Sequence, residues 1–268
     1  MSLDPLFADT PGEQLLTRQI HEPLISRLVG PFDDTRRVAG LAQSARPSSD
    51  ATVWRLRLRP GVRFGDGTPF NAAAVLDNVE RWRSSLVAQE IIGSPLADAP
   101  RPDLVRFILA APDRDFGRRL ASPRLGIVSP QAIAGAAGGA LAPGEAGDSG
   151  TGAFELRERS AESLLLAVNG DWWGSDRGLG PGLDQLEFKV VPDAGERLAM
   201  LADGAVQVAS DLAPAELRQV RANPLLTAVS SGGDAGLGLG VERSIRGISA
   251  DDPAPPLNGV WRTGIGVD

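Results

Sequence analysis

Apolar and polar residues alternate with a period of two over residues 53–59. Trp54, Leu56 and Leu58 occupy one side of this segment, and arginines occupy most of the other. A period of two is that of an extended chain, so the pattern predicts a half-buried strand. The basic positions here and just beyond, Arg55, Arg57, Arg59 and Arg63, could bind an anion, but we expect a solvated sheet face that discourages edge pairing.

A period near 3.6 begins after Asn71. Val75, Val79 and Trp82 would share one face of a helix, and asparagine is typical of the residue that caps a helix N-terminus. Further helices are predicted over residues 14–22, 195–202 and 215–221. Strands are predicted over residues 62–64, 104–109, 126–129, 153–159, 163–168, 186–191, 206–209, 226–230 and 237–241, with 153–168 forming a hairpin. Strands that alternate with helices predict a mixed α/β sheet.

Two segments have no clear period. Residues 135–152 are rich in glycine and alanine, which favours a mobile loop or a small boundary. Residues 251–256 are rich in proline, so we expect them to lie extended over the surface. Leu257, Val260 and Trp261 would be their apolar anchors.

The composition excludes several classes of function. The chain has 268 residues, 42% of them hydrophobic, and a net charge of -7, which argues against nucleic acid as its main partner. It has no cysteine, which excludes disulfides and thiolate metal sites, and it has no Walker A loop. No apolar run approaches the roughly 20 residues that span a bilayer. Residues 1–10 do not resemble a signal peptide, and no lipobox cysteine is present.

Catalytic and metal-binding residues are also scarce. His21 is the only histidine, and it has no H-x-x-x-H partner, so it cannot form a metal site alone. Residues 148–151 spell the D-S-G-T of an aspartic protease, but that chemistry needs two such carboxylates, and only a homodimer could supply the second. We therefore expect no metal, no cofactor and no enzymatic activity.

A long motif lies at residues 56–72, which read L-R-L-R-P-G-V-R-F-G-D-G-T-P-F-N-A. It closely resembles the L-R-x-G-V-x-F-x-D-G-x-P-F-x-A signature of the family 5 extracellular solute-binding proteins, the group of oligopeptide, dipeptide and nickel binders. Shorter matches follow the family's order at residues 3–5, 21–24, 41–44, 150–154, 169–174, 183–186 and 204–207.

The resemblance implies a periplasmic-binding-protein-like type II lobe of mixed α/β structure. Its sheet-bearing part would comprise residues 1–35 and 146–268, with an inserted α+β subdomain at residues 36–145. The family's later P-F-x-D-x-R-V-R-x-A block has no counterpart in this chain. We therefore expect a single lobe, with the second ligand-binding lobe absent.

By resemblance, the chain would be the solute-binding component of an ABC-type import system, located outside the cytoplasm. A peptide-like solute and an ABC permease would be its partners. A two-lobed binder closes over its ligand, so one lobe should capture weakly; halving the binding free energy turns a ~1 μM ligand into a ~1 mM ligand. The alternative is a non-catalytic interaction protein that keeps the lobe for docking to a permease or another partner. A second copy could cover the face left by the missing lobe.

The resemblance also suggests ligand-facing residues. The cleft loop of the family corresponds to Gly150, Thr151, Gly152, Ala153 and Phe154, where glycines would let the backbone approach a ligand. The loop could equally be a plain turn into a strand. His21 and Glu22 match a segment beside the cleft, although His21 could be a surface or capping residue. Trp172 and Trp173 could stack on a ligand, or the pair could pack the lobe; of the two, Trp172 is the one that we expect to face the ligand.

Overall fold

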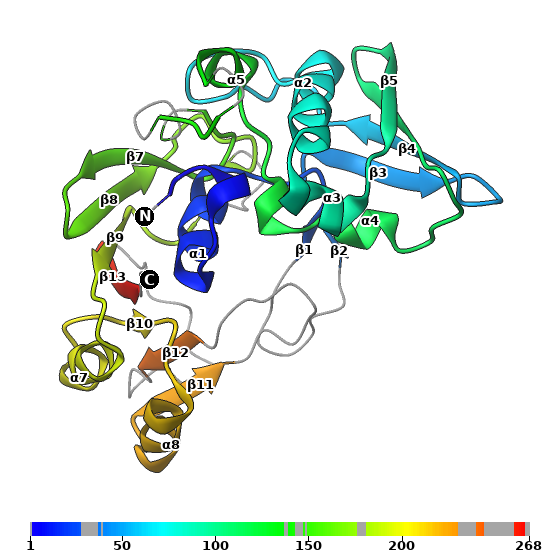
Figure 1. Ribbon diagram of the computed structural model, residues 1–268. Helices are drawn as coiled ribbons and strands as arrows, with labels where there is room; N and C mark the ends of the chain where they lie inside the picture. The colour runs from blue at the N-terminus through cyan, green and yellow to red at the C-terminus, as the bar shows by residue number, and fades with distance from the viewer. Residues whose placement is uncertain are drawn as a thin grey trace, which may run out of the picture.

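The computed structural model describes residues 2–27, 37–38, 40–136, 139–142, 147, 149–175, 181–229, 240–243 and 260–265. Two sheets dominate it (Figure 1): one of four strands and one of seven. A two-stranded ribbon of β1 (Ser26–Arg27) and β2 (Arg37–Val38) forms a third, small sheet.

The four-stranded sheet is antiparallel, with the order β3-β4-β6-β5. Its strands are β3 (Ala42–Pro47), β4 (Val53–Leu58), β5 (Leu96–Arg101) and β6 (Leu104–Ile108). The predicted alternation in β4 is confirmed, because Trp54, Leu56 and Leu58 are buried while Arg55 and Arg57 are exposed. The apolar side of this sheet packs on the helix α2 (Ala72–Arg83), whose Val75, Val79 and Trp82 join the same core.

Asn71 caps α2 as predicted, since its side-chain oxygen accepts a hydrogen bond from the backbone N–H of Ala74 at 3.1 Å. The helix leads into α3 (Leu86–Ile92), and the short α4 (Phe116–Arg119) and the 3-10 helix η2 (Pro123–Leu125) follow β6.

We expect Asn71→Ala to lower the free energy of unfolding by about 1 kcal/mol, because one N–H group at the N-terminus of α2 loses its acceptor. Urea unfolding measures this loss, and Asn71→Asp, which keeps an acceptor, should lose less; equal losses would contradict the capping role.

The N-terminal helix α1 spans Pro11–Ile20, not the predicted 14–22. Its true start follows a capping box, in which the Thr10 side chain accepts from the Glu13 N–H and the Glu13 carboxylate accepts from the Thr10 N–H. The residues before it form the 3-10 helix η1 (Pro5–Phe7). The T-x-x-E pattern was the local signal for this start, and apolar periodicity alone missed it.

The seven-stranded sheet has the order β11-β12-β10-β13-β9-β8-β7. Its strands are β7 (Phe154–Arg159), β8 (Ser163–Val168), β9 (Gln185–Val190), β10 (Val208–Ala209), β11 (Leu226–Val229), β12 (Gly240–Arg243) and β13 (Val260–Ile265). The predicted β7–β8 hairpin is confirmed. Among the strands that the structure describes, only β13 makes parallel pairs, with β9 and with β10. The helices α7 (Ala194–Asp203) and α8 (Pro214–Ala222) match their predictions closely and pack with β10 and β11 in a small core of their own.

Two predicted segments need correction. Residues 62–64 form only an isolated bridge between Arg63 and Pro69. Residues 126–129 are extended but not a strand, because their N–H groups bond in turn to Glu22, Asn78 and Ser149 rather than to one neighbour. Val260 and Trp261 are the first two residues of β13, which pairs with β9. Leu257 and the 251–256 segment lie outside the described residues, as does most of the predicted 237–241 strand.

Within the described part of the chain, no helix is long and apolar enough to cross a membrane.

Candidate functional site

The predicted site residues come from separate parts of the chain, and the structure brings most of them together at the end of α1. His21 is the C-cap residue of α1, and Glu22 follows it. The loop at residues 149–154, which leads into β7, lies against this end: the Gly152 N–H donates to the carbonyl of Ile20 at 2.8 Å. On its other side, the Gly65 N–H donates to the Gly150 carbonyl at 2.9 Å, which ties the loop to the 56–72 motif.

The two glycines of this loop are required because the backbone at the end of α1 leaves no room for a side chain. A Cβ built on Gly150 would lie 1.9 Å from the Ile20 carbonyl oxygen, and one on Gly152 would lie 2.2 Å from the Gln19 carbonyl oxygen. Neither distance permits a side chain without a backbone shift. The sequence predicted a close backbone approach here, and the partner in the structure is the last turn of α1; contact with a ligand stays a prediction.

Glu22 is a buried carboxylate at the centre of this arrangement, with 9% of its surface exposed. It accepts hydrogen bonds from the Thr151 hydroxyl at 3.0 Å and from the Trp173 indole N–H at 2.8 Å. Burial raises the pKa of Glu22 to about 7, although the polar hydrogens of Trp173, Thr151 and Trp172 and the Arg59 charge act in the opposite direction. Glu22 can therefore hold or release a proton near neutral pH.

Arg59 corrects the prediction of a solvated basic face. Arg55, Arg57 and Arg63 are exposed, but Arg59 is only 5% exposed. Its guanidinium lies 3.7 Å from the centre of the Trp173 ring, and its Nε and Nη2 donate to the Gly40 carbonyl at 3.2 and 3.1 Å. Arg59 thus stacks on the indole that donates to Glu22, and stacking of this kind stabilises by roughly 1–2 kcal/mol when desolvated.

Both tryptophans were candidates and Trp172 was expected to face the ligand, but Trp173 is the one whose indole N–H donates to Glu22. The two rings are 5.1 Å apart at 51°, and both are half-buried. The Trp172 ring packs against Gly174, and within the described residues its indole nitrogen has no hydrogen-bond acceptor of good geometry. The adjacent W-W pair was the available signal, but nothing in the pattern said which ring would face the carboxylate.

Ala153 and Phe154 complete the predicted loop. Ala153 is half-buried, and its carbonyl accepts from the Asn169 N–H at 2.8 Å. Phe154 is the first residue of β7 and is buried in the core that packs α1 on β7, β8 and β9. Asp148, the first residue of the protease-like motif, lies outside the described residues.

The His21 ring is fully buried, so it is not a surface histidine. Burial lowers its pKa to about 4, although the Asp4 charge nearby raises it. Carbonyls of Leu3 and Ile127 lie near the ring, but in the described part of the structure neither ring nitrogen has a hydrogen-bond partner of good geometry. The imidazole is therefore neutral at pH 7.

Beside His21 lies a buried ion pair. Asp4 is fully buried and pairs with Arg81 of α2, and its carboxylate also accepts from the N–H groups of Leu6 and Leu141 at 3.1 and 2.9 Å. The pair fastens the N-terminal segment to α2. Among the described residues, no group of three or more histidine, aspartate or glutamate side chains could hold a metal ion.

Comparison with known proteins places this geometry in context. The family model described as "Bacterial extracellular solute-binding proteins, family 5 Middle" matches residues 37–257. The glutathione-binding protein GsiB of Escherichia coli (strain K12) is 30% identical over 218 residues, which are 78% of this chain and 40% of that protein. The probable D,D-dipeptide-binding periplasmic protein DdpA of the same strain is 26% identical over 82% of this chain and 43% of its own length.

Solved structures give the same picture of the fold. The periplasmic binding protein DppA from Helicobacter pylori, in complex with the peptide STSA, superposes with a TM-score of 0.69 at 22% identity, over 85% of this chain and 48% of that one. NikA from Brucella suis, in complex with Fe(III)-EDTA, gives 0.66 at 24% identity, over 85% and 46%. The predicted mixed α/β lobe of the periplasmic-binding-protein type is confirmed, and the chain spans about 40% of the length of the curated relatives it matches.

Proposed function

Because the chain belongs to the family 5 bacterial extracellular solute-binding proteins, we propose that it is a solute-binding component of an ABC-type import system. The solute is peptide-like, the partner is an ABC permease, and the protein acts outside the cytoplasm without catalysing a reaction. The observation that carries this proposal is the family match, which runs through the 56–72 motif, the 149–154 loop and the Trp172–Trp173 pair.

The division of the chain belongs to the same proposal. An inserted α+β part at residues 36–145 is supported by the four-stranded sheet, which lies wholly within residues 42–108. A sheet-bearing part made of residues 1–35 and 146–268 is supported by the seven-stranded sheet, which lies within residues 154–265.

The solute would lie against the surface over the Glu22 site. Support comes from the convergence there of His21, Glu22, the 150–154 loop and Trp172. The Glu22 carboxylate, held by Thr151 and Trp173, fixes the loop whose backbone would face the solute. Because only one lobe would contact the peptide, we expect a Kd between roughly 1 μM and 1 mM.

Native mass spectrometry of the purified chain tests the proposal first. A peptide-sized mass that is retained under gentle ionisation and lost on denaturation would support capture. Titration calorimetry with glutathione, a D,D-dipeptide and a tetrapeptide mixture then ranks the solutes. If no peptide binds and a permease subunit still does, the chain is an interaction protein that has kept only the docking role. A bare dimer would indicate that a second copy covers the binding face.

Thr151→Val should weaken peptide binding about fivefold to tenfold. The variant keeps the shape of the side chain but removes the hydroxyl that ties the loop to Glu22, and such a hydrogen bond contributes about 1 kcal/mol. Calorimetric Kd values measure the change. Thr227→Val, at an exposed position of β11, is the matched control and should leave the Kd unaltered. Equal Kd values for both variants would remove the 150–154 loop from the site.

A further inference from the structure

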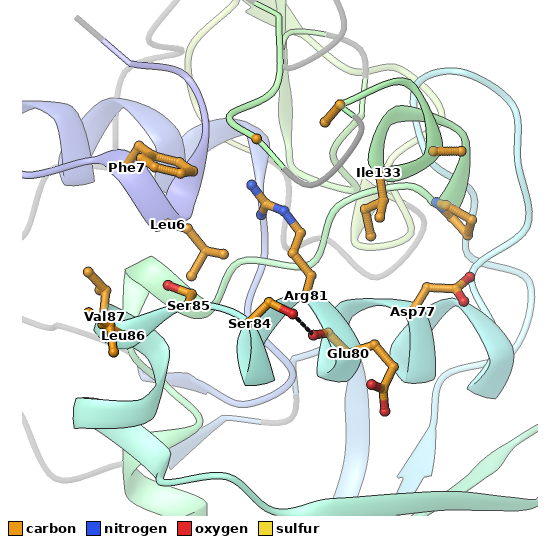
Figure 2. A pocket seen from close by; sticks show the side chains of 14 residues that line it. Leu6, Phe7, Asp77, Glu80, Arg81, Ser84, Ser85, Leu86, Val87 and Ile133 are labelled. Atoms are coloured by element: carbon orange, nitrogen blue, oxygen red, sulfur yellow. Dashed lines mark hydrogen bonds between the residues drawn. The ribbon is translucent and has the colours of Figure 1, made fainter.

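A pocket that shares no residue with the Glu22 site lies between η1, α2, the start of α3 and α5 (Pro130–Gly135). Figure 2 shows its walls, and its volume is about 730 Å³. Small-molecule sites usually enclose about 300–1,000 Å³ and are lined mainly by apolar side chains. Here the larger apolar lining residues are Leu6, Phe7, Leu86, Val87, Pro130 and Ile133. Neither Glu22 nor the 150–154 loop contributes to it.

The apolar lining is unusually open to solvent. Four large hydrophobic side chains are exposed among the described residues, and two of them, Phe7 at 46% and Leu86 at 77%, line this one pocket. They come from different elements, η1 and α3, and Figure 2 shows both at the same end of the pocket. Exposed apolar side chains that gather around a concavity are typical of a binding surface.

The other end of the pocket carries an unpaired negative charge. Asp77 stands on α2 near Ile133 (Figure 2), and its carboxylate has no ion-pair or hydrogen-bond partner within the described part of the chain. Arg81, one turn further along α2, would be the ordinary partner at this spacing. Arg81 instead turns toward Asp4 and is neutralised there, and Glu80 pairs with Arg83 at 3.0 Å. Asp77 is exposed, but the partial loss of water around its carboxylate still raises its pKa.

We propose that this pocket binds a small amphiphilic amine, whose apolar body packs on Phe7, Leu6 and Leu86 while its ammonium group pairs with Asp77. The two ends suit one molecule. Asp77 and Ser84 both line the pocket and are seven residues apart, which is about 10 Å of helix rise. This length is comparable with an extended alkyl chain of medium size, so octylamine is the probe of choice.

Titration calorimetry of octylamine into the full chain tests the proposal, with 1-octanol and octanoate as neutral and anionic probes of the same length. We expect saturable binding in the order octylamine, 1-octanol, octanoate. Asp77→Asn should weaken octylamine about twofold to fivefold and leave 1-octanol unchanged, as expected for an exposed charge pair. Ala134→Trp, which fills the pocket from α5, should weaken all of the probes that bind.

Two matched controls lie outside the pocket. Glu90→Gln removes an exposed carboxylate of α3, and Ala73→Trp adds the same bulk at an exposed position of α2; both should bind octylamine like the parent chain. The proposal is overturned if octanoate binds as tightly as octylamine, if Asp77→Asn leaves the octylamine Kd unaltered, or if no probe saturates. Peptide capture is measured with other ligands and with Thr151→Val. Failure of octylamine binding would therefore leave the proposed peptide binding untouched, and failure of peptide binding would leave the amine site untouched.

Discussion

Gly150→Ala should destabilise the protein by at least about 3 kcal/mol. The new Cβ would lie 1.9 Å from the carbonyl oxygen of Ile20 and 2.6 Å from its carbonyl carbon, and both are backbone atoms. A flexible side chain could move aside, but here the end of α1 must move, which breaks the hydrogen bond between Gly152 and Ile20. Overpacking of this kind typically costs about 1–3 kcal/mol, and more where the backbone is the obstacle.

Urea unfolding, followed by tryptophan fluorescence, measures this loss. Gly170→Ala is the matched control, because a Cβ at Gly170 meets nothing within 4 Å. We expect the control to unfold within about 0.5 kcal/mol of the parent chain, as surface substitutions do. Similar unfolding free energies for the two alanine variants would mean that the loop does not lie against α1 as described.

Removal of either His21 or Glu22 should give the protein a steep pH dependence that the parent chain lacks. The folded state lowers the pKa of His21 from 6.5 to about 4 and raises the pKa of Glu22 from 4.5 to about 7, in both cases mainly because the group is buried. The contribution of His21 to stability is present above pH 6.5 and is lost as the pH falls toward 4. That of Glu22 is present below pH 4.5 and is lost as the pH rises through 7.

Between pH 4.5 and 6.5 the two slopes are opposite and nearly equal, so they cancel in the parent chain. Glu22→Gln leaves His21 alone, and the free energy of unfolding should then fall by about 3 kcal/mol on acidification from pH 7 to 4.5. His21→Phe leaves Glu22 alone, and stability should rise by a similar amount over the same range. Urea midpoints at four pH values measure both slopes.

Glu158→Gln, at an exposed position of β7, should retain the pH profile of the parent chain. Parallel profiles for Glu22→Gln and His21→Phe would mean that one of the two side chains is in contact with water. Because the expected slopes have opposite signs, a general loss of stability in either variant cannot imitate the result.

Local sequence patterns correctly predicted the elements that are determined by residues close together in the sequence. The alternation in β4 and the Asn71 cap of α2 follow from neighbours in sequence, and the structure confirms both. The alternation failed at Arg59, because its burial depends on the Trp173 ring and the Gly40 carbonyl, which lie far away in the chain. Contacts between residues that are distant in the sequence leave no periodic pattern around Arg59.

Some contacts of the candidate site could be predicted from the sequence, and others could not. The resemblance to a family placed Glu22 and the 150–154 loop near each other, and the structure joins them through Thr151. It favoured Trp172 over Trp173 as the ligand-facing ring, because two adjacent tryptophans differ only in which way each ring turns, and packing decides that. The pocket at Asp77 had no signal at all, since its walls come from four separate elements.

The position of β13 has a consequence for how the molecule assembles. In the seven-stranded sheet, β9 and β10 are joined only through β13, which comes from residues 260–265 and runs parallel to both. The β7–β9 meander can form early from local contacts. The β10–β12 group can be hydrogen-bonded to it only after this late segment has inserted between them. The pairing of β9 with β13 closes a loop of the whole chain between residues 190 and 260, and contacts between residues so far apart in sequence form slowly. During synthesis on the ribosome, the two halves of the sheet should therefore fold first and join last.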